Sequence, residues 1–354
     1  MNATTSNLFD LAQPVAPTTR FQGSKQKLLP WLWQHLRPLQ FSTSLDAFGG
    51  SGSVSYFLKR HAKHVTCNDI LVSSALGATA LIENDDVRLN STEVDLLLER
   101  QSHLHYDNFI ARTFADIYFT ADENIWLDTI AQNIPLLGNR FKRAIAYHAL
   151  FQSAISKRPY NLFHRKNLYM RFAAVDRSFG NKTTWDRPFA EHFRNFVRMT
   201  NAAIFKAGPC RASNVDARNV EGEFDLVYID PPYINRHGVG VDYHGFYHFL
   251  EGLADYKNWP AQIDHSSKHR RLIPKPSRWT NKTTIHQAFA ELFERYRHSI
   301  LAVSYRSDGI PSLEELAGML KQVKKQVAVH TLDRGYKYAL SKNGRSSECL
   351  LIGT

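Results

Sequence analysis

The four residues Asp230-Pro231-Pro232-Tyr233 combine a carboxylate, two prolines and an aromatic ring in one short stretch. Proline has no backbone N–H and a fixed φ, so tandem prolines form a stiff turn whose carbonyl groups remain free to accept hydrogen bonds. A carboxylate beside such carbonyls is a pocket of acceptors that suits an amine donor, and an aromatic ring can stack on a flat heterocycle. The alternative is a rigid turn that merely ends a strand. The four residues alone do not separate these two interpretations.

The apolar run ahead of Asp230 predicts a buried strand. Residues 224–229 read Phe-Asp-Leu-Val-Tyr-Ile, a segment of strand length that is rich in β-forming residues. In open α/β sheets, ligand sites gather at the carboxyl ends of the strands. The Asp230 stretch therefore stands where such a fold places a reaction site.

A glycine-rich stretch nearer the N-terminus predicts a nucleoside-binding unit. Residues 44–54 read as a strand that ends in a glycine turn, with Gly50 and Gly52, and opens a helix. A second predicted strand, about 20 residues further on, ends at Asp69. Small residues let a backbone loop approach a ligand closely, and an acid at this spacing can accept hydrogen bonds from ribose hydroxyls.

Two common phosphate-binding fingerprints do not fit the sequence. The third glycine of a dinucleotide fingerprint falls at Ser55, which argues against NAD. Residues 20–25 (Arg-Phe-Gln-Gly-Ser-Lys) lead into a short amphipathic helix whose N-terminus would favour an anionic group. A Walker phosphate loop would need a glycine where Thr18 stands. A plain helix start therefore remains an alternative for residues 20–25.

The composition indicates a soluble globular protein with a basic surface. The chain has 354 residues, of which 43% are hydrophobic and 22% charged, and its formal net charge is +11. This excess of cations suggests a polyanionic partner. Cys67, Cys210 and Cys349 are widely spaced, so neither a disulfide framework nor a structural zinc site is expected. An apolar run of about 18 residues and a signal-peptide core are both missing, which predicts a cytoplasmic protein with no membrane contact.

The basic residues concentrate in two segments without acidic residues. Residues 129–175 contain eight Lys or Arg and no Asp or Glu, and residues 265–282 contain six Lys or Arg. In residues 156–171, cations that can neutralise phosphates alternate with aromatic and amide side chains that can stack on bases or read their edges. The alternatives are a solvated face and a flexible surface loop. The predicted nucleic-acid contacts are Lys157, Arg158, Tyr160, Asn161, Arg165, Lys166, Arg171, Arg270 and Arg271.

The order of these motifs resembles the Dam-like DNA adenine methylases, the alpha class of N6-adenine DNA methyltransferases. The similarity extends from the catalytic motifs to the C-terminal strands and covers well over half of the chain, and residues 84–202 lie where that family keeps its target-recognition domain. The stretches that carry it are Phe21-Gln-Gly-Ser-Lys25, Asp46-Ala-Phe-Gly-Gly-Ser-Gly52, Asn68-Asp69, Asp230-Pro-Pro-Tyr233, Tyr243-His244, residues 300–305 and residues 348–352.

The resemblance implies an α/β fold, with a Rossmann-like S-adenosylmethionine-dependent methyltransferase sheet and an inserted, mainly helical target-recognition domain. The expected parts are a flexible tail (1–17), the cofactor-binding part of the catalytic domain (18–83), the target-recognition domain (84–202) and the target-base part (203–354). The C-terminal pattern predicts a strand at 299–305 and a helix at 312–323 with a capping-box start, followed by short strands at 327–332, 337–340 and 348–352 with an antiparallel edge pair.

The resemblance also implies S-adenosylmethionine as the methyl donor. Phe21 and Lys25 fall in the motif that contacts this cofactor, the glycine turn would lie against its methionine part, and Asp69 would bind its ribose hydroxyls. Val215 and Asp216 stand where the family holds the adenine ring of the cofactor. The full set of expected cofactor contacts is Phe21, Lys25, Asp46, Gly50, Gly52, Asp69, Val215, Asp216 and Asp230.

By the same resemblance, Asp230, Pro231, Pro232 and Tyr233 form the pocket for an adenine flipped out of duplex DNA, at an unstacking cost of roughly a few kcal/mol. The N6 amine would donate to the Asp230 carboxylate and the Pro231 carbonyl, while Tyr233 stacks on the ring. Those acceptors draw the nitrogen out of conjugation, so that its lone pair can attack the sulfonium methyl in line. Positioning and electrostatics carry such a transfer without a covalent enzyme intermediate, and no metal is expected.

Other functions stay open at the level of the sequence. An RNA adenine N6-methyltransferase would use the same amine pocket, and a non-catalytic DNA-binding protein could retain the fold, although an intact Asp230, Tyr233 and Asp69 count against it. Protein glutamine methylation is less favoured, because its family usually places Asn where Asp230 stands. Pro209-Cys210 resembles the Pro-Cys of cytosine-C5 methyltransferases, but a Glu-Asn-Val partner motif is missing, so Cys210 is predicted to be a strand or loop residue.

The expected partner is double-stranded DNA in a bacterial or phage-type cytoplasm. A nuclease motif does not accompany these motifs, so a solitary methylase and the modification half of a restriction system, with its cognate restriction endonuclease encoded nearby, both fit the sequence. An obligate protein partner is not predicted.

Overall fold

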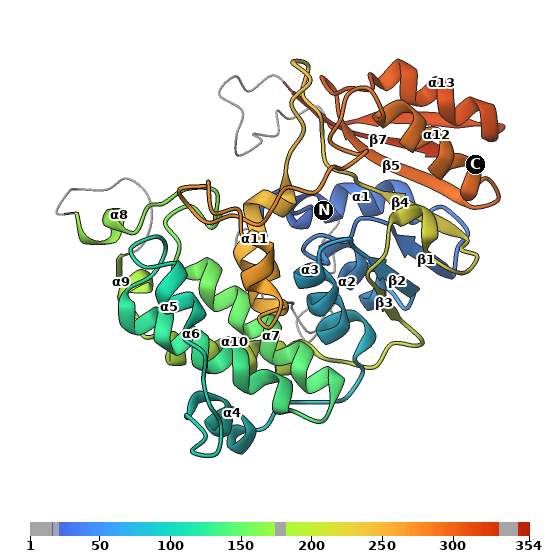
Figure 1. Ribbon diagram of the computed structural model, residues 1–354. Coiled ribbons are helices and arrows are strands. Elements are labelled where there is room, and N and C mark those ends of the chain that lie inside the picture. The colour runs from blue at the N-terminus through green and yellow to red at the C-terminus, as the bar shows by residue number, and fades with distance from the viewer. Residues whose placement is uncertain (1–15, 17–20, 174–181, 333–345) are drawn as a thin grey trace, which may run out of the picture.

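A seven-stranded sheet forms the centre of the computed structural model, which describes residue 16 and residues 21–173, 182–332 and 346–354 (Figure 1). Its order is β3-β2-β1-β4-β5-β7-β6, with parallel pairing from β3 to β5 and an antiparallel β7 between β5 and β6. The mixed α/β class and the antiparallel C-terminal pair are confirmed, whereas the strand predicted at 337–340 lies outside the described residues. The strands are β1 (Thr43–Asp46), β2 (His64–Asn68), β3 (Arg211–Ser213), β4 (Leu226–Ile229), β5 (Ile300–Arg306), β6 (Val327–Thr331) and β7 (Glu348–Gly353).

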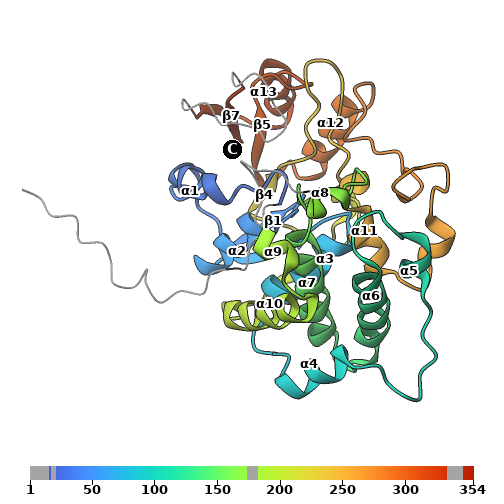
Figure 2. The same cartoon turned by 90° about the vertical axis from the view of Figure 1, so that its left-hand side faces the viewer.

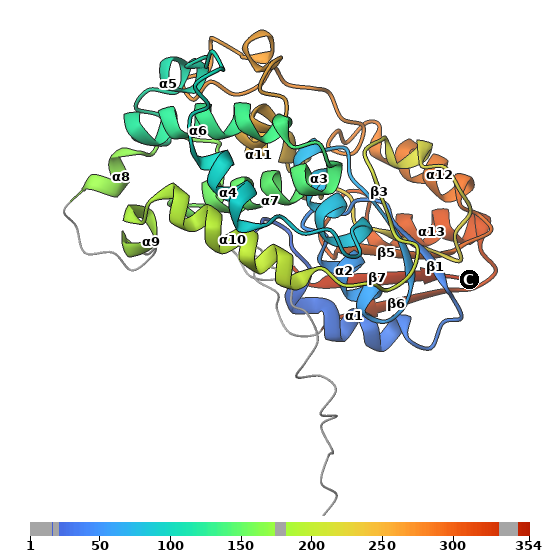
Figure 3. The same ribbon diagram turned by 90° about the horizontal axis from the view of Figure 1, so that it is seen from below.

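Helices cover both faces of the sheet, because its central strands are apolar on both sides. All four residues of β4 are buried: Leu226 and Tyr228 belong to one apolar cluster, and Val227 to the other. Figure 3 shows α1 on one side of the strands and α12 and α13 on the other. The first layer contains α1 (Leu29–Leu36), α2 (Ser53–Arg60) and α3 (Val72–Ala78), and the second contains α12 (Ile285–Arg295) and α13 (Leu313–Val323).

Local sequence signals set where several helices begin. Ser312 caps α13 and forms a reciprocal capping box with Glu315, as the sequence predicted. The helix predicted after residue 25 begins as a 3-10 turn at Gln26–Leu28 and continues into α1.

A helical region lies against the first layer and is visible beside the sheet in Figure 2. Its longest helix, α7, packs on both α3 and α10. One continuous apolar cluster joins the helical region to one face of the sheet, so these helices are packed on the central sheet. The helices are α4 (Ser91–Leu98), α5 (Phe109–Thr113), α6 (Ala121–Asn133), α7 (Arg140–Ser156), α8 (Tyr169–Phe172), α9 (Lys182–Asp186) and α10 (Phe189–Ala203).

One further helix, α11 (Tyr243–Ala254), lies between the sheet and the helical region (Figure 1). Within the described ranges, every helix is too short or too polar to cross a lipid bilayer. Of the predicted N-terminal tail, residue 16 is described, and it packs partly buried against the core. The predicted role of residues 84–202 in target recognition stays a prediction.

Candidate active site

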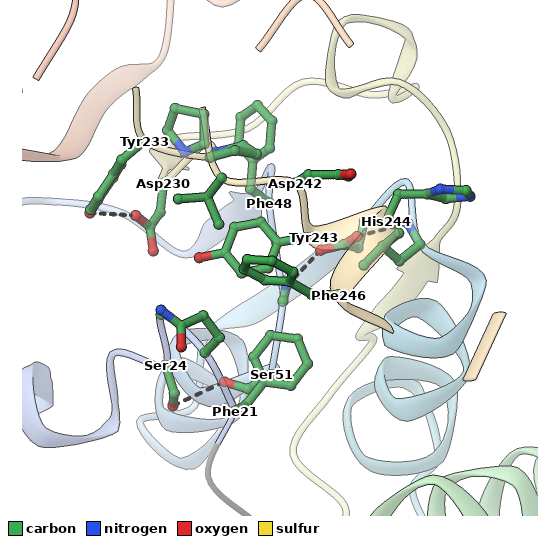
Figure 4. A pocket seen from close by; sticks show the side chains of 18 of the residues that line it. Phe21, Ser24, Phe48, Ser51, Asp230, Tyr233, Asp242, Tyr243, His244 and Phe246 are labelled. Atoms are coloured by element: carbon green, nitrogen blue, oxygen red, sulfur yellow. Dashed lines mark hydrogen bonds between the residues drawn. The ribbon is translucent and has the colours of Figure 1, made fainter. Parts of the chain in front are cut away.

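The chain order of the strands reverses between β1 and β4, and a large cleft opens beside their carboxyl ends. Its volume is about 3670 Å³, well above the roughly 300–1,000 Å³ of an ordinary small-molecule site, so it can admit more than a cofactor. Figure 4 shows Asp230 and Tyr233 side by side, with Phe21, Ser24 and Ser51 across the pocket from them. The predicted site residues that line this cleft are Phe21, Lys25, Asp46, Gly50, Asp69, Val215, Asp216, Asp230, Pro231, Pro232 and Tyr233.

Lys25 and Tyr233 hold the carboxylate of Asp230. The Lys25 Nζ lies 2.8 Å from Asp230 Oδ1 and 2.7 Å from Oδ2, and it also donates to the Tyr233 hydroxyl at 2.8 Å. The Tyr233 hydroxyl in turn lies 2.8 Å from Asp230 Oδ1. Burial raises the pKa of Asp230, while the Lys25 ammonium opposes this rise and the carboxylate of Glu348 adds to it. Asp230 is therefore a fixed and comparatively basic acceptor at the end of β4.

The Tyr233 ring is mostly enclosed. Tyr233 is 9% exposed. Its ring packs edge to face against Tyr305, with 5.0 Å between the ring centroids, and Lys25 Nζ lies 4.9 Å from the centroid of the Tyr233 ring. The Tyr233 hydroxyl is thus hydrogen-bonded to the Asp230 carboxylate while the Tyr233 ring is largely buried. Stacking of Tyr233 on a target base stays a prediction.

Packing against α11 places the N-terminal motif. Phe21 stacks on Tyr247 at 4.5 Å, and the Gln22 backbone N–H donates to the Tyr247 hydroxyl. Gly23 has φ +80°, and a Cβ there would lie 2.3 Å from the hydroxyl oxygen of Tyr243, so this position favours glycine. The motif thereby delivers Lys25 to Asp230. The sequence assigned Lys25 to the cofactor, and its contact with Asp230 was not anticipated.

The glycine turn and Asp69 are joined directly. Gly50 has φ +53° and its backbone N–H donates to Asp69 Oδ2 at 2.7 Å, while the N–H of Leu71 donates to Oδ1 at 2.8 Å. Each carboxylate oxygen keeps a second lone pair, so Asp69 can still accept from ligand hydroxyls. Burial raises its pKa to about 6 against the effect of both N–H groups. Gly52, with φ +71°, lies beside a small neighbouring pocket rather than in the main cleft.

Val215 and Asp216 line the cleft together with two aromatic residues that sequence reasoning missed. Phe48 and Trp279 meet edge to face at 4.8 Å, and both line the cleft. The Asp216 carboxylate accepts from Arg218, which lowers its pKa. Phe48 belongs to the glycine-rich motif, whereas Trp279 lies in the basic segment 265–282, which was predicted to contact nucleic acid.

Three of the predicted nucleic-acid contacts are buried and need correction. Lys157, Arg158 and Arg171 are each 3% exposed or less. Lys157 and Arg171 converge on Glu123 at 2.8 and 2.6 Å, and Arg158 donates to the backbone carbonyls of Leu162 and of residue 165. The segment without acidic residues therefore supplies cations to the protein interior, and the acid that pairs with two of them, Glu123, comes from α6. Lys157 and Arg171 are thus committed to an internal ion pair, whereas Arg158 is a buried residue of the cleft wall.

The remaining predicted contacts lie nearer the surface. Tyr160, Asn161 and Arg165 line the cleft, and Lys166 is exposed beside them. Arg270 and Arg271 are half-buried outside the cleft lining, where Arg271 pairs with Asp264 at 3.2 Å. These six residues stay predicted DNA contacts. Cys210 directly precedes β3, which confirms the prediction of a strand or loop residue, and burial raises the pKa of its free thiol.

The sheet order and the acidic site at its switch point fit the methyltransferase class that the motifs predicted. The family follows from comparison with known proteins. Residues 21–300 match the D12 class N6 adenine-specific DNA methyltransferase family, and the chain belongs to that family. The enzyme class and the Dam-like family predicted from the motifs are confirmed.

Three curated relatives are modification enzymes by name. The chain is 28% identical over 348 residues to the type II methyltransferase M2.HphI of Haemophilus parahaemolyticus, covering 96% of this chain and 98% of that protein. It is 22% identical over 319 residues to the modification methylase LlaI of Lactococcus lactis subsp. lactis, and 24% identical over 357 residues to the modification methylase StsI of Streptococcus sanguinis. These matches cover 86% and 92% of this chain, but 48% and 49% of the two relatives. The chain thus spans nearly all of the first relative and about half of the other two.

The cleft fits the methyl donor that the family implies. Asp46 Oδ1 is buried in the cleft wall and lacks a hydrogen-bond partner among the described residues, although Oδ2 accepts from Ser55 at 2.7 Å. An unpaired buried carboxylate oxygen is costly, so a ligand that brings a donor is favoured here. Together with Asp69 and the glycine turn, this donor set is compatible with an amino acid joined to a nucleoside.

Proposed function

We propose that this chain methylates the N6 amine of adenine at a specific sequence in duplex DNA, as the modification enzyme of a type II restriction-modification system. The observation that carries the proposal is the Asp230 carboxylate, which Lys25 and Tyr233 fix at the end of β4 inside a cleft large enough for a cofactor and an extrahelical base. The names of the relatives M2.HphI, LlaI and StsI support the biological setting.

The cofactor would occupy the half of the cleft nearer β1 and β2. Asp69 would accept from its ribose hydroxyls, Asp46 and the Gly50 turn would meet its amino-acid part, and Phe48 and Val215 would enclose its adenine. When bound, S-adenosylmethionine supplies a methyl group attached to a positively charged sulfur. The sulfur is the leaving group and keeps the S–C electron pair as the methyl group forms a new bond to the nitrogen.

The protein's part in the transfer is to orient and activate the amine. One N6–H would donate to Asp230, and the carbonyl of Pro231 would accept the other, so the nitrogen lone pair is directed away from the ring. The nitrogen must release one proton once it has gained the methyl group. Asp230 is suited to take that proton, because its pKa is raised by burial.

DNA would enter across Tyr160, Asn161 and Arg165, which line the same cleft as Asp230. A flipped base costs roughly a few kcal/mol in lost stacking, and enclosure in the pocket offsets this cost. The exposed Arg165 and Lys166 would contact phosphates.

Methylation-sensitive sequencing of DNA from cells that express the protein tests this proposal. The expected result is N6-methyladenine at one recurring sequence, absent from cells that express Asp230→Ala. N4-methylcytosine at the modified sites, or methylation of RNA with unmodified DNA, would overturn the assignment.

A further inference from the structure

Glu348 is a buried carboxylate that touches both groups holding Asp230. It is the first residue of β7, lies opposite Arg306 of β5, and has no exposed surface. Its Oε1 accepts from the hydroxyls of Tyr233, at 2.8 Å, and of Ser304, and it lies 3.6 Å from Lys25 Nζ. Taking a carboxylate out of water is costly unless it is paired, so these contacts help to stabilise Glu348 inside the sheet.

The Lys25 ammonium is shared unequally between two carboxylates. It lies within 2.8 Å of both oxygens of Asp230 and 3.6 Å from Glu348. The Tyr233 hydroxyl makes the same bridge, with 2.8 Å to each carboxylate. A hydroxyl has one hydrogen, so Tyr233 can donate to one of the two carboxylates at a time. Asp230 and Glu348 are therefore linked twice, through a cation and through a proton donor.

We infer that Glu348 is a positioning residue for the methyl transfer. It holds the Lys25 ammonium and the Tyr233 hydroxyl in the places from which both orient Asp230, and its negative charge offsets part of the Lys25 charge. Asp230 thereby stays a strong acceptor for the N6 amine. This inference rests on the proposed function, because it concerns how Asp230 serves that reaction.

The charge balance of the reaction explains why a second carboxylate would help. As the N–C bond forms and the S–C bond breaks with its electrons left on sulfur, positive charge passes to the amine nitrogen. The nitrogen then releases one proton to Asp230, from which it passes to water. Glu348 adds a second carboxylate next to Lys25 and Tyr233, and fixed negative charge aimed at a developing positive charge lowers the barrier.

The test compares Glu348→Gln with the wild-type protein, using labelled S-adenosylmethionine and unmethylated genomic DNA in single turnovers across pH. We expect the rate to fall at least about tenfold while the affinity for S-adenosylmethionine stays within about threefold, since the effect belongs to the transfer step. The acid limb of the rate profile should move to lower pH, because loss of a like-charged neighbour lowers the pKa of Asp230. A matched control is Asp128→Asn, which changes a buried carboxylate in the helical region and should leave the limb in place.

An unmoved limb in Glu348→Gln, with activity lost in proportion to unfolded protein, would reduce Glu348 to a core residue. If Glu348→Gln does not fold, Glu348→Asp keeps the charge but withdraws it by one methylene. A reduced rate with retained cofactor affinity then supports the inference, and a wild-type rate overturns it. A wild-type protein that leaves adenine unmodified would instead refute the proposed function, so the two failures are distinct.

Discussion

At the scale of single residues, the site is a set of acids made more basic by burial. Burial raises the pKa values of Asp46, Asp69 and Asp230, which all line one cleft. Carboxylates in such a setting gain most when a ligand supplies donors or positive charge. The methyl donor carries both hydrogen-bond donors and a positive charge, so its binding should offset the free-energy cost of burying these carboxylates.

Asp69 gives a pH-dependent prediction for cofactor affinity. Its pKa is about 6, so it is ionised and accepts from ribose hydroxyls at neutral pH, and it becomes protonated as the pH falls through about 6. Calorimetry of S-adenosylmethionine binding should show affinity that weakens below about pH 6. Asp69→Asn should bind more weakly at neutral pH and lose much of this dependence. A wild-type affinity that stays constant from pH 5 to 8 would contradict the role of Asp69.

Asp46 gives a prediction for stability in the absence of ligand. Burial raises its pKa to about 7, above the value near 4 expected in the unfolded chain, so the folded state holds the proton more tightly. The contribution of Asp46 to the free energy of unfolding is therefore fully present below about pH 4 and is lost as the pH rises through about 7. Asp46→Asn should raise the unfolding temperature at pH 8 and bind the cofactor less tightly. An unfolding temperature that falls equally at pH 4 and pH 8 would count against this account.

At the scale of elements, buried cations tie the helical region together. Glu123 of α6 accepts from Arg171 of α8 and from Lys157 at the end of α7. Although burial alone would raise the pKa of Glu123, the hydrogen bonds from Arg171 and Lys157 bring it below its usual value. The three helices thus meet at one ionic centre.

Removing one cation from this centre should destabilise the protein. Arg171→Met should lower the free energy of unfolding by on the order of 3 kcal/mol, as expected when a buried ion pair loses a partner. Arg112→Met is a matched control, since Arg112 pairs with Asp107 at the surface, and it should cost less than about 1 kcal/mol. If denaturant titrations gave the same loss in free energy of unfolding for both variants, burial of the ion pairs around Glu123 would not contribute to stability.

Exposed cations should act on DNA binding instead. Replacing Arg165 and Lys166 by Gln should weaken DNA binding and reduce the salt dependence of the affinity by about two in the log–log slope. Lys321→Gln with Lys325→Gln removes the same charge in the second layer, at the end of α13 and just after it, and should leave the slope nearly unchanged. The same slope for all three proteins, measured by fluorescence anisotropy, would remove residues 165–166 from the interface.

The elements themselves were largely predictable, and the contacts between them were not. The Asp230 strand, the Gly50 turn and the Ser312 cap follow from short-range patterns in the sequence, and each was found where predicted. The pairing of Lys157 with Glu123 was missed, because an acid-free stretch of sequence says nothing about acids that other helices bring to it.

At the scale of the whole molecule, the reaction site joins distant parts of the chain. Lys25 precedes the first strand, Asp230 follows β4, and Glu348 begins β7, yet all three meet around one ammonium. Family motifs point to the stretches around these residues, but their mutual contacts depend on the strand order. The function could therefore be predicted from motifs, whereas the role of Glu348 required the sheet that brings β7 beside β5.

The most direct measurement incubates the purified protein with labelled S-adenosylmethionine and duplex DNA, then digests the DNA and separates its nucleosides. The account predicts label in N6-methyladenine with wild-type protein. It predicts none with Asp230→Asn, which should still bind the cofactor, because the carboxylate that accepts the amine and its proton is gone. Label in N4-methylcytosine, or N6-methyladenine formed at the wild-type rate by Asp230→Asn, would contradict the account.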